Sequence, residues 1–329
     1  MSLLFQDSFS HYVTAESSRK LLSGGSTVNT PSRFSGSRSL SNGSPTHIWQ
    51  WASAEGTVVV GFAYDASTLE TFPTEWRLRL AGAVQCYFKI NANGSISLHN
   101  SGGTQLAVTS TGVVVAASWQ YVEVKVVIAD SGSCVINVNG SQVLNASSID
   151  TKSQSGAGAD QLAAVGQGSQ SYATDLYIEN ANILGPSRHE LQMPTANGEV
   201  NQWTPDSGSN YARVNENDST NGMDDDTSYV HSTTAGHYDL YAFSFSATGA
   251  AIRSLAVNFA AKMDVAGSRT MKAVVRRKST DTNYDSSTTF SLTEAYKIYQ
   301  FIWQVCPWTS SAWTESDLSD CEVGIKLEA

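Results

Sequence analysis

The sequence is short of charge, and of positive charge in particular. Charged residues make up 15% of the 329 residues, with 20 Lys and Arg against 30 Asp and Glu, which gives a formal net charge of −10. Contact with phosphates needs clustered Lys and Arg, so this balance argues against a nucleic-acid partner. We expect the one basic run, Arg276–Lys278, to be the solvated end of a strand.

Long apolar runs are absent as well. No stretch approaches the roughly 18 apolar residues that a membrane-spanning helix needs. The first residues, MSLLFQDSFSH, contain no basic region and only a four-residue apolar run, which is not the pattern of a signal peptide. We therefore expect synthesis in the cytoplasm without Sec-type export, and no membrane insertion.

The four cysteines, Cys86, Cys134, Cys306 and Cys321, include no CxxC pair, so a zinc site is not expected. Buried reduced thiols are the expectation for a protein made in the cytoplasm. A disulfide within each half, Cys86 with Cys134 or Cys306 with Cys321, stays open.

Period-two alternation of apolar and polar residues is the main pattern in the sequence. Val122, Val124 and Val126 alternate with Glu123 and Lys125, as expected for a strand with one wet face. A second signal follows, because Asn-Gly in CVINVNGSQVLN is typical of a type I′ hairpin turn. No 12-residue window keeps a 3.6-residue apolar period, so residues 1–185 are predicted to form an antiparallel β-sandwich.

A segment with two prolines and no alternation, residues 186–199, is predicted to be a linker. Strand patterns resume over 200–329, although residues 252–264 fit a helix as well as a strand, and the neighbours favour the strand. Thr314–Asp317 has the spelling of a capping box and predicts one short helix. The predicted fold class is all-β, with two antiparallel, jelly-roll-like β-sandwich domains in tandem.

Three consecutive acids, Asp224, Asp225 and Asp226, are the candidate metal ligands. An EF-hand is excluded, because the alignment that places Gly222 at position 6 puts Ser228 at position 12, where a bidentate Glu is needed. Calcium held by the three carboxylates remains one hypothesis, and no other cofactor is expected. The alternative is a polar turn whose Asx side chains bond the local backbone.

Trp49 and Trp51 lie two residues apart, so both point to one face of an extended segment. Together with His47 they could form a stacking platform for a sugar ring. Packing in a core or an interface is the alternative for the same three residues.

The sequence contains no recognisable catalytic pattern. Glycoside hydrolysis needs two carboxylates flanking the scissile bond, and the acids Glu70, Glu75, Glu123 and Glu179 are dispersed. Neither a nucleophile elbow nor a phosphate-binding loop occurs. These observations predict a protein that is not an enzyme.

The first half contains LLFQDSFSHY at the start, SRFSGSRSLSNG (32–43) and SWQYVEVKVVIADSGSCVINVNGSQV (118–143). In these segments it resembles the laminin-G/concanavalin A-like lectin domains of phage virion proteins. In that family a Trp precedes a long alternating strand and a hairpin with an Asn-Gly turn.

The second half contains, in order, WTPDSGSNYARVNE (203–216), DDDTSYV (224–230), AGHYDLYAFS (235–244), AGSRTMKAVVRRKSTDTNYD (266–285) and AWTESDLSDCEVGIKL (312–327). In these segments it resembles a module of tailed-bacteriophage structural proteins. This resemblance implies a virion component, external and present in multiple copies on tail, neck, baseplate or capsid, with other virion proteins and copies of itself as partners. The alternatives are a host-surface glycan-binding adhesin and a capsid decoration protein.

Overall fold

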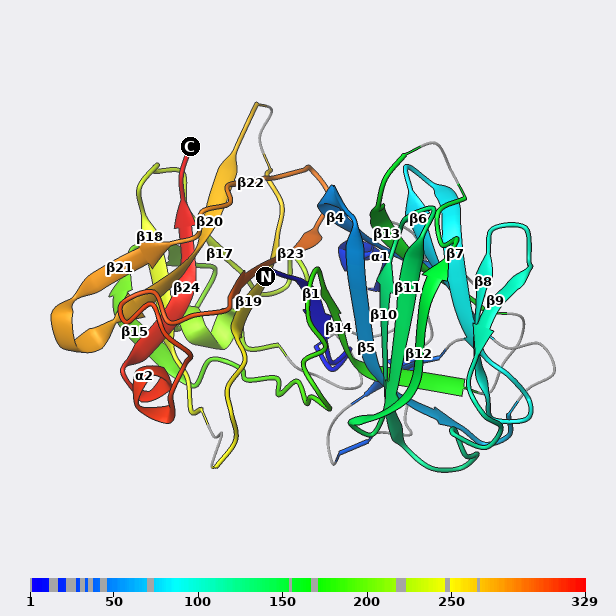
Figure 1. Ribbon diagram of the computed structural model, residues 1–329. Helices are drawn as coiled ribbons and strands as arrows, with labels where there is room; N and C mark the ends of the chain where they lie inside the picture. The colour runs from blue at the N-terminus through cyan, green and yellow to red at the C-terminus, as the bar shows by residue number, and fades with distance from the viewer. Residues whose placement is uncertain are drawn as a thin grey trace. The chain divides into compact units, whose positions relative to one another are not determined.

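The computed structural model describes residues 2–11, 17–21, 28–29, 33–34, 38–41, 46–69, 74–153, 156–166, 171–216, 223–245, 249–264 and 267–329. The chain divides into two compact units, Met1–Glu190 and Leu191–Ala329 (Figure 1). The division falls inside the segment predicted as a linker. Each unit is all-β and built from antiparallel sheets, as the sequence predicts.

The first unit contains an eight-stranded sheet with the order β12-β11-β10-β5-β14-β3-β2, and β1 also pairs with β14. Its strands are β1 (Leu3–Asp7), β2 (Val28–Asn29), β3 (Ser39–Ser41), β5 (Thr57–Ala66), β10 (Gln120–Val127), β11 (Gly132–Val138), β12 (Ser141–Ile149) and β14 (Ser171–Glu179).

A six-stranded sheet with the order β4-β13-β6-β7-β8-β9 completes this unit. Its strands are β4 (His47–Glu55), β6 (Glu75–Leu80), β7 (Ala83–Ile90), β8 (Ile96–Asn100), β9 (Gln105–Val108) and β13 (Ala159–Val165). A short helix, α1, spans Ser17–Lys20.

The two sheets face each other through their apolar sides. Phe62 of the eight-stranded sheet stacks on Trp76 of the six-stranded sheet with ring centroids 4.3 Å apart, and it lies 6.3 Å from Phe88. All three side chains are buried, as are Val122 and Val124 of β10. The first unit is therefore a β-sandwich whose core lies between the sheets.

The Asn139–Gly140 hairpin has the predicted geometry. Both residues have positive φ, 51° and 79°, as a type I′ turn requires. Asn139 also holds the start of the adjacent strand, because its Oδ1 accepts a hydrogen bond from the Tyr121 amide.

The second unit has a sheet with the order β15-β18-β24-β20-β21, in which β22 pairs with β20, and two two-stranded sheets, β16-β17 and β19-β23. Its elements are β15 (Ala196–Asn201), β16 (Thr204–Pro205), β17 (Val230–His231), β18 (Tyr238–Ala242), β19 (Leu255–Ala261), β20 (Thr270–Arg277), β21 (Thr282–Asp285), β22 (Phe290–Ser291), β23 (Lys297–Trp303), β24 (Cys321–Leu327), α2 (Glu315–Ser319), and the 3-10 turns Asn210–Arg213 and Lys278–Thr280.

The ambiguous run 252–264 contains a strand, β19, in antiparallel register with β23. Val257 and Trp303 from this pair share a core with Val275 and Val323 from the larger sheet, so the two layers form a second sandwich. The predicted capping box is present at α2, where Thr314 and Asp317 exchange side-chain and backbone hydrogen bonds.

All four cysteines are buried free thiols, and burial raises the pKa of Cys134 to about 12. Among the residues that the structure describes, no helix has the length and apolar character to cross a membrane.

Candidate functional site

The predicted sugar platform lies inside the first unit. Trp49, Trp51 and His47 are 1%, 7% and 1% exposed. Trp49 stacks against Trp76 at 6.1 Å, and the Trp51 Nε1–H donates to the Ala159 carbonyl. The two tryptophans do share one face, but it is the face that meets the opposite sheet, so a sugar ring cannot reach them. Packing, the alternative, describes these residues.

Burial of His47 has a consequence for stability. It lowers the pKa of His47 to about 4, whereas the unfolded value is about 6.5. Between these values the unfolded chain binds a proton that the folded chain does not, so stability falls as the pH falls. Moving from pH 7.5 to pH 5 should cost about 2 kcal/mol through this residue.

The measurement is urea unfolding at both pH values for the native chain and for His47→Asn. The variant should lose about 2 kcal/mol less on acidification than the native chain. An equal loss in both proteins would show that His47 does not carry this pH dependence.

The predicted calcium ligands point to different partners. Asp224 accepts hydrogen bonds from the Ser228 amide and hydroxyl at 3.0 Å, while Asp226 pairs with Lys262 at 2.7 Å. Asp225 has a left-handed backbone conformation, with φ 55°. Within the described parts of the chain, no group of three or more His, Cys, Asp or Glu could hold a metal ion. The polar turn is what the structure shows at this position.

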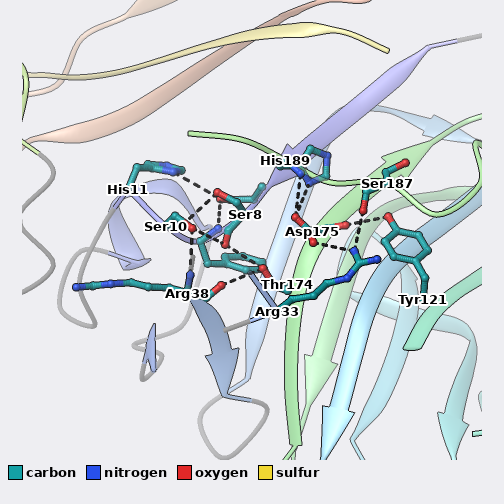
Figure 2. Close-up of polar contacts among 12 residues, drawn as sticks. Ser8, Ser10, His11, Arg33, Arg38, Tyr121, Thr174, Asp175, Ser187 and His189 are labelled. Atoms are coloured by element: carbon teal, nitrogen blue, oxygen red, sulfur yellow. Dashed lines mark hydrogen bonds and ion pairs between the residues drawn. The ribbon is translucent and has the colours of Figure 1, made fainter. Parts of the chain in front are cut away.

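A dense polar cluster lies between the eight-stranded sheet and the segments that cover it (Figure 2). Asp175, at a bulge of β14 with φ 50°, accepts hydrogen bonds from Arg33 Nη1 and the His189 amide at 2.9 Å, and its carbonyl accepts from the Tyr121 hydroxyl. Arg33 also donates to the Ser187 carbonyl.

The cluster continues at the N-terminal strand. Burial raises the pKa of Asp7, but the neighbouring Lys20, 2.9 Å away, and His11 outweigh it and lower the pKa overall. Asp7 is 3% exposed and Asp175 is 2% exposed, so these polar groups are turned toward one another and toward the backbone. The cluster fixes the N-terminal strand and residues 187–189 on β14.

The outer face of the six-stranded sheet has a different character. Trp76, Phe88 and Leu98 are in register on β6, β7 and β8 and point into the core. Because side chains alternate along a strand, the next in-register row, Arg77, Tyr87 and His99, points the other way. Directly opposed side chains lie about 5 Å apart, so these three groups meet.

We call Glu75, Arg77, Tyr87, Lys89 and His99 the outer-face cluster. The Tyr87 and His99 rings stack with centroids 4.9 Å apart and planes 7° from parallel. Arg77 donates from Nε and Nη2 to Glu75 Oε2 at 2.8 and 2.5 Å. Burial and Glu75 raise the pKa of Tyr87, against the opposing effect of Arg77. The cluster combines a partly exposed tyrosine, backed by a buried histidine that is 7% exposed, with a fixed guanidinium.

The orientation of His99 is also fixed. Its Nδ1 lies 3.1 Å from the Gly103 carbonyl, and its Nε2 lies 2.9 Å from the Ser97 hydroxyl. A carbonyl oxygen only accepts, so neutral His99 carries its proton on Nδ1, and Nε2 accepts from Ser97. Asn91 in turn donates to the Ser97 hydroxyl at 3.0 Å. These contacts hold the ring flat against Tyr87.

A bulge in β7 sets which residue faces Arg77. The register shifts by one residue at Gln85, so Arg77 pairs with Tyr87, whereas an unbroken hairpin from the Leu80–Ala83 pair would place Cys86 opposite it. The buried Gln85 side chain anchors the bulge by donating to the Gly156 and Gly158 carbonyls. None of the residues of the outer-face cluster was predicted as a binding residue. The polar alternation in EWRLRL, CYFKI and SISLHN is the signal that could have found them.

No family model matches the chain, and no curated protein sequence matches it. Solved structures do. One is an endo-β-1,4-glucuronan lyase from Trichoderma reesei, at 13% identity and TM-score 0.36, covering 55% of this chain and 96% of that one. A second is a Bacillus subtilis protein with a galectin-like fold, at 10% identity and TM-score 0.36, with the same coverage of both chains.

A third is the carbohydrate-binding module CBM66 from Bacillus subtilis, at 8% identity and TM-score 0.32, covering 47% of this chain and 95% of that one. These likenesses are to β-sandwich, galectin-like folds, and they carry no activity or ligand across to this chain. They do correct one expectation. The prediction that the chain is not an enzyme, which was drawn from dispersed acids and missing motifs, is contradicted, because the solved structures of this fold include an endo-β-1,4-glucuronan lyase.

Proposed function

We propose that the first unit binds a glycan on the outer face of its six-stranded sheet, with the outer-face cluster as the contact surface. The observation that carries the proposal is the in-register row Arg77, Tyr87 and His99. His99, which is 7% exposed, supports the Tyr87 ring by stacking on it, so the partly exposed Tyr87 supplies the aromatic contact for a sugar ring and Arg77 supplies donors for its oxygens.

Beyond Arg77 the in-register row continues through Ala163 of β13 and Ile48 of β4, which carry no hydrogen-bonding side chains. The neighbouring row, through Arg79, contains Gln161 of β13, which is 7% exposed, and Gln50 of β4, which is exposed. The Gln50 amide offers both donors and acceptors, which suits hydroxyl groups. Polar side chains on β4, β6 and β7 therefore lie on this face, a spread that suits an oligosaccharide better than a single sugar.

The test is a glycan array with the full chain, followed by calorimetry on the glycans that bind. Tyr87→Ala should weaken binding by about 2 kcal/mol, or about thirtyfold, since a central aromatic contact is lost. Tyr229→Ala, which removes an exposed tyrosine of the second unit, is the matched control and should leave the affinity unchanged. Equal affinity of the Tyr87→Ala and native chains would overturn the proposal. Mass analysis of the bound glycan shows whether it is also cleaved.

The resemblance of residues 203–327 to a phage structural module is the basis for proposing where the protein binds glycans. In this proposal the chain is a host-surface glycan-binding adhesin of a tailed phage, located on the virion in multiple copies beside other virion proteins. The outer-face cluster favours the adhesin over a purely structural part. A reconstruction of the phage particle would test whether the chain is an adhesin on the virion. If the outer-face cluster were buried against a neighbouring protein in the particle, the adhesin proposal would be contradicted.

A further inference from the structure

The outer face of the six-stranded sheet carries the opposite sign to the chain as a whole. The protein has a net charge of −10, yet Arg77, Arg79 and Lys89 project from this face beside a single in-register carboxylate, Glu75. Asp160, at the end of the face, accepts a hydrogen bond from the Ala81 amide at 3.0 Å. A local excess of cations raises the concentration of anionic ligands at such a surface.

The Arg77 guanidinium is set up for a second carboxylate. Its bonds to Glu75 use the Nε–H and one hydrogen of Nη2. A guanidinium has five N–H donors in a plane, so the edge formed by Nη1 and Nη2 keeps the fork that binds a carboxylate with two parallel hydrogen bonds. Glu75 therefore orients the Arg77 guanidinium and leaves its Nη1–Nη2 edge for a second carboxylate.

Two further cations flank that edge. Arg79 lies two residues from Arg77 on the same face of β6, and its Nε donates to the Gly82 carbonyl at 2.7 Å, which fixes the side chain. Lys89 stands opposite Glu75 in the register of β6 and β7, diagonal to Arg77 and on the same face as Tyr87. Both lie within the reach of a second sugar residue along the sheet.

We propose that the ligand of this face is an acidic sugar, whose anionic group pairs with Arg77 while the partly exposed Tyr87 ring contacts the sugar. Lys89 and Arg79 contact further anionic groups of the same chain. This inference rests on the proposed glycan binding and goes beyond it by naming the chemical class of the ligand. Repeated acidic groups suit the spacing of the three cations along and across two strands.

The experiment measures binding of the full chain to a uronate oligosaccharide and to its methyl ester, which has the same sugars without the charge. A sialyl-oligosaccharide and a sulfated oligosaccharide distinguish the source of the anionic group. We expect at least tenfold tighter binding of an acidic ligand than of its neutral counterpart, with an affinity that falls as salt rises. Arg77→Gln should lower the affinity for the acidic ligand about tenfold or more and change the affinity for the ester far less.

Lys89→Gln should lower the affinity for the acidic ligand severalfold, and Lys125→Gln, on the eight-stranded sheet, is the charge-matched control. Equal affinity for the uronate and its ester would overturn the acidic-sugar inference and leave glycan binding standing. No binding of any charged or neutral oligosaccharide would overturn both. Equal losses in Lys125→Gln and Arg77→Gln would assign the effect to overall charge and overturn the inference.

Discussion

Gly61→Ala is expected to lower the free energy of unfolding of the first unit by about 3 kcal/mol or more. A methyl group at Gly61 would lie 2.1 Å from Cε1 of Tyr177, and no Cβ atom tolerates such a contact. Gly61 is paired with Tyr177 on one side and with Glu123 on the other, in the centre of the eight-stranded sheet. The backbone at Gly61 cannot move without disturbing the hydrogen bonds of β5 to both β14 and β10.

Displacing the Tyr177 ring would break more than packing. Its hydroxyl donates to Glu123 at 2.5 Å and accepts a hydrogen bond from the Leu184 amide at 3.0 Å, while Glu123 also accepts from the Gly185 amide. A buried carboxylate that loses a donor pays a desolvation cost of about 1–3 kcal/mol. The steric and polar losses therefore add at this one glycine.

Gly56→Ala is the matched control, because nothing lies within 4 Å of a methyl group there and the backbone needs no left-handed φ. This variant should be neutral or more stable by up to about 1 kcal/mol, since alanine restricts the unfolded chain. Hydrogen exchange of peptides from β5 under increasing urea reports on the first unit alone. Similar stabilities of the two alanine variants would show that the Tyr177 ring moves aside at no cost.

The sequence predicts local structure well where the signal lies within one strand or turn. Alternation gave the buried face of Val122, Val124 and Val126, and Asn139–Gly140 gave the turn that follows. The wet face expected for Glu123 was wrong, because Glu123 is 0% exposed and accepts hydrogen bonds from the Tyr177 hydroxyl and the Gly185 amide. Prediction from the sequence fails where the environment of a side chain depends on a strand that is distant in the sequence. Trp49 and Trp51 share a face as expected. That this face is buried follows from its packing against residues of other strands, such as Trp76, which the local sequence does not reveal.

The outer-face cluster shows the same limit. The strands containing Arg77, Tyr87 and His99 could be read from the sequence, and their adjacency follows from two short loops. Which residues meet depends on the bulge at Gln85, and that bulge is anchored by the carbonyls of Gly156 and Gly158 from far along the chain. A one-residue error in register pairs Arg77 with Cys86 and removes the site.

The basic run 276–278 was expected to be solvated, and for Arg276 that expectation is wrong. Arg276 is 4% exposed and its guanidinium pairs with Glu322 at 3.1 Å and with Glu199 and Asp281 at 2.6 Å. Three carboxylates occupy this cation, so it does not present a polyanion site. Arg277, the next residue, is 37% exposed and pairs with Asp320.

Arg276→Met is therefore expected to cost the second unit about 3–5 kcal/mol, because Glu322, which is 3% exposed, would remain charged and buried without its cation. Arg277→Met removes an equal charge from the same strand but from a half-exposed pair, and it should cost less than about 1 kcal/mol. Hydrogen exchange of peptides from β20 and β24 separates these outcomes, since the two strands are in direct register.

Replacing both Arg276 and Glu322, the latter by Gln, identifies the cause of the loss. If the cost of Arg276→Met comes from the stranded carboxylate, the double variant should recover part of it, because no buried charge is left unpaired. If the double variant is as unstable as the sum of the single variants, the methylene packing of Arg276 is responsible instead. In both cases the two adjacent arginines differ in effect because side chains alternate along β20: Arg276 points toward Glu322 and Glu199, and Arg277 points toward Asp320.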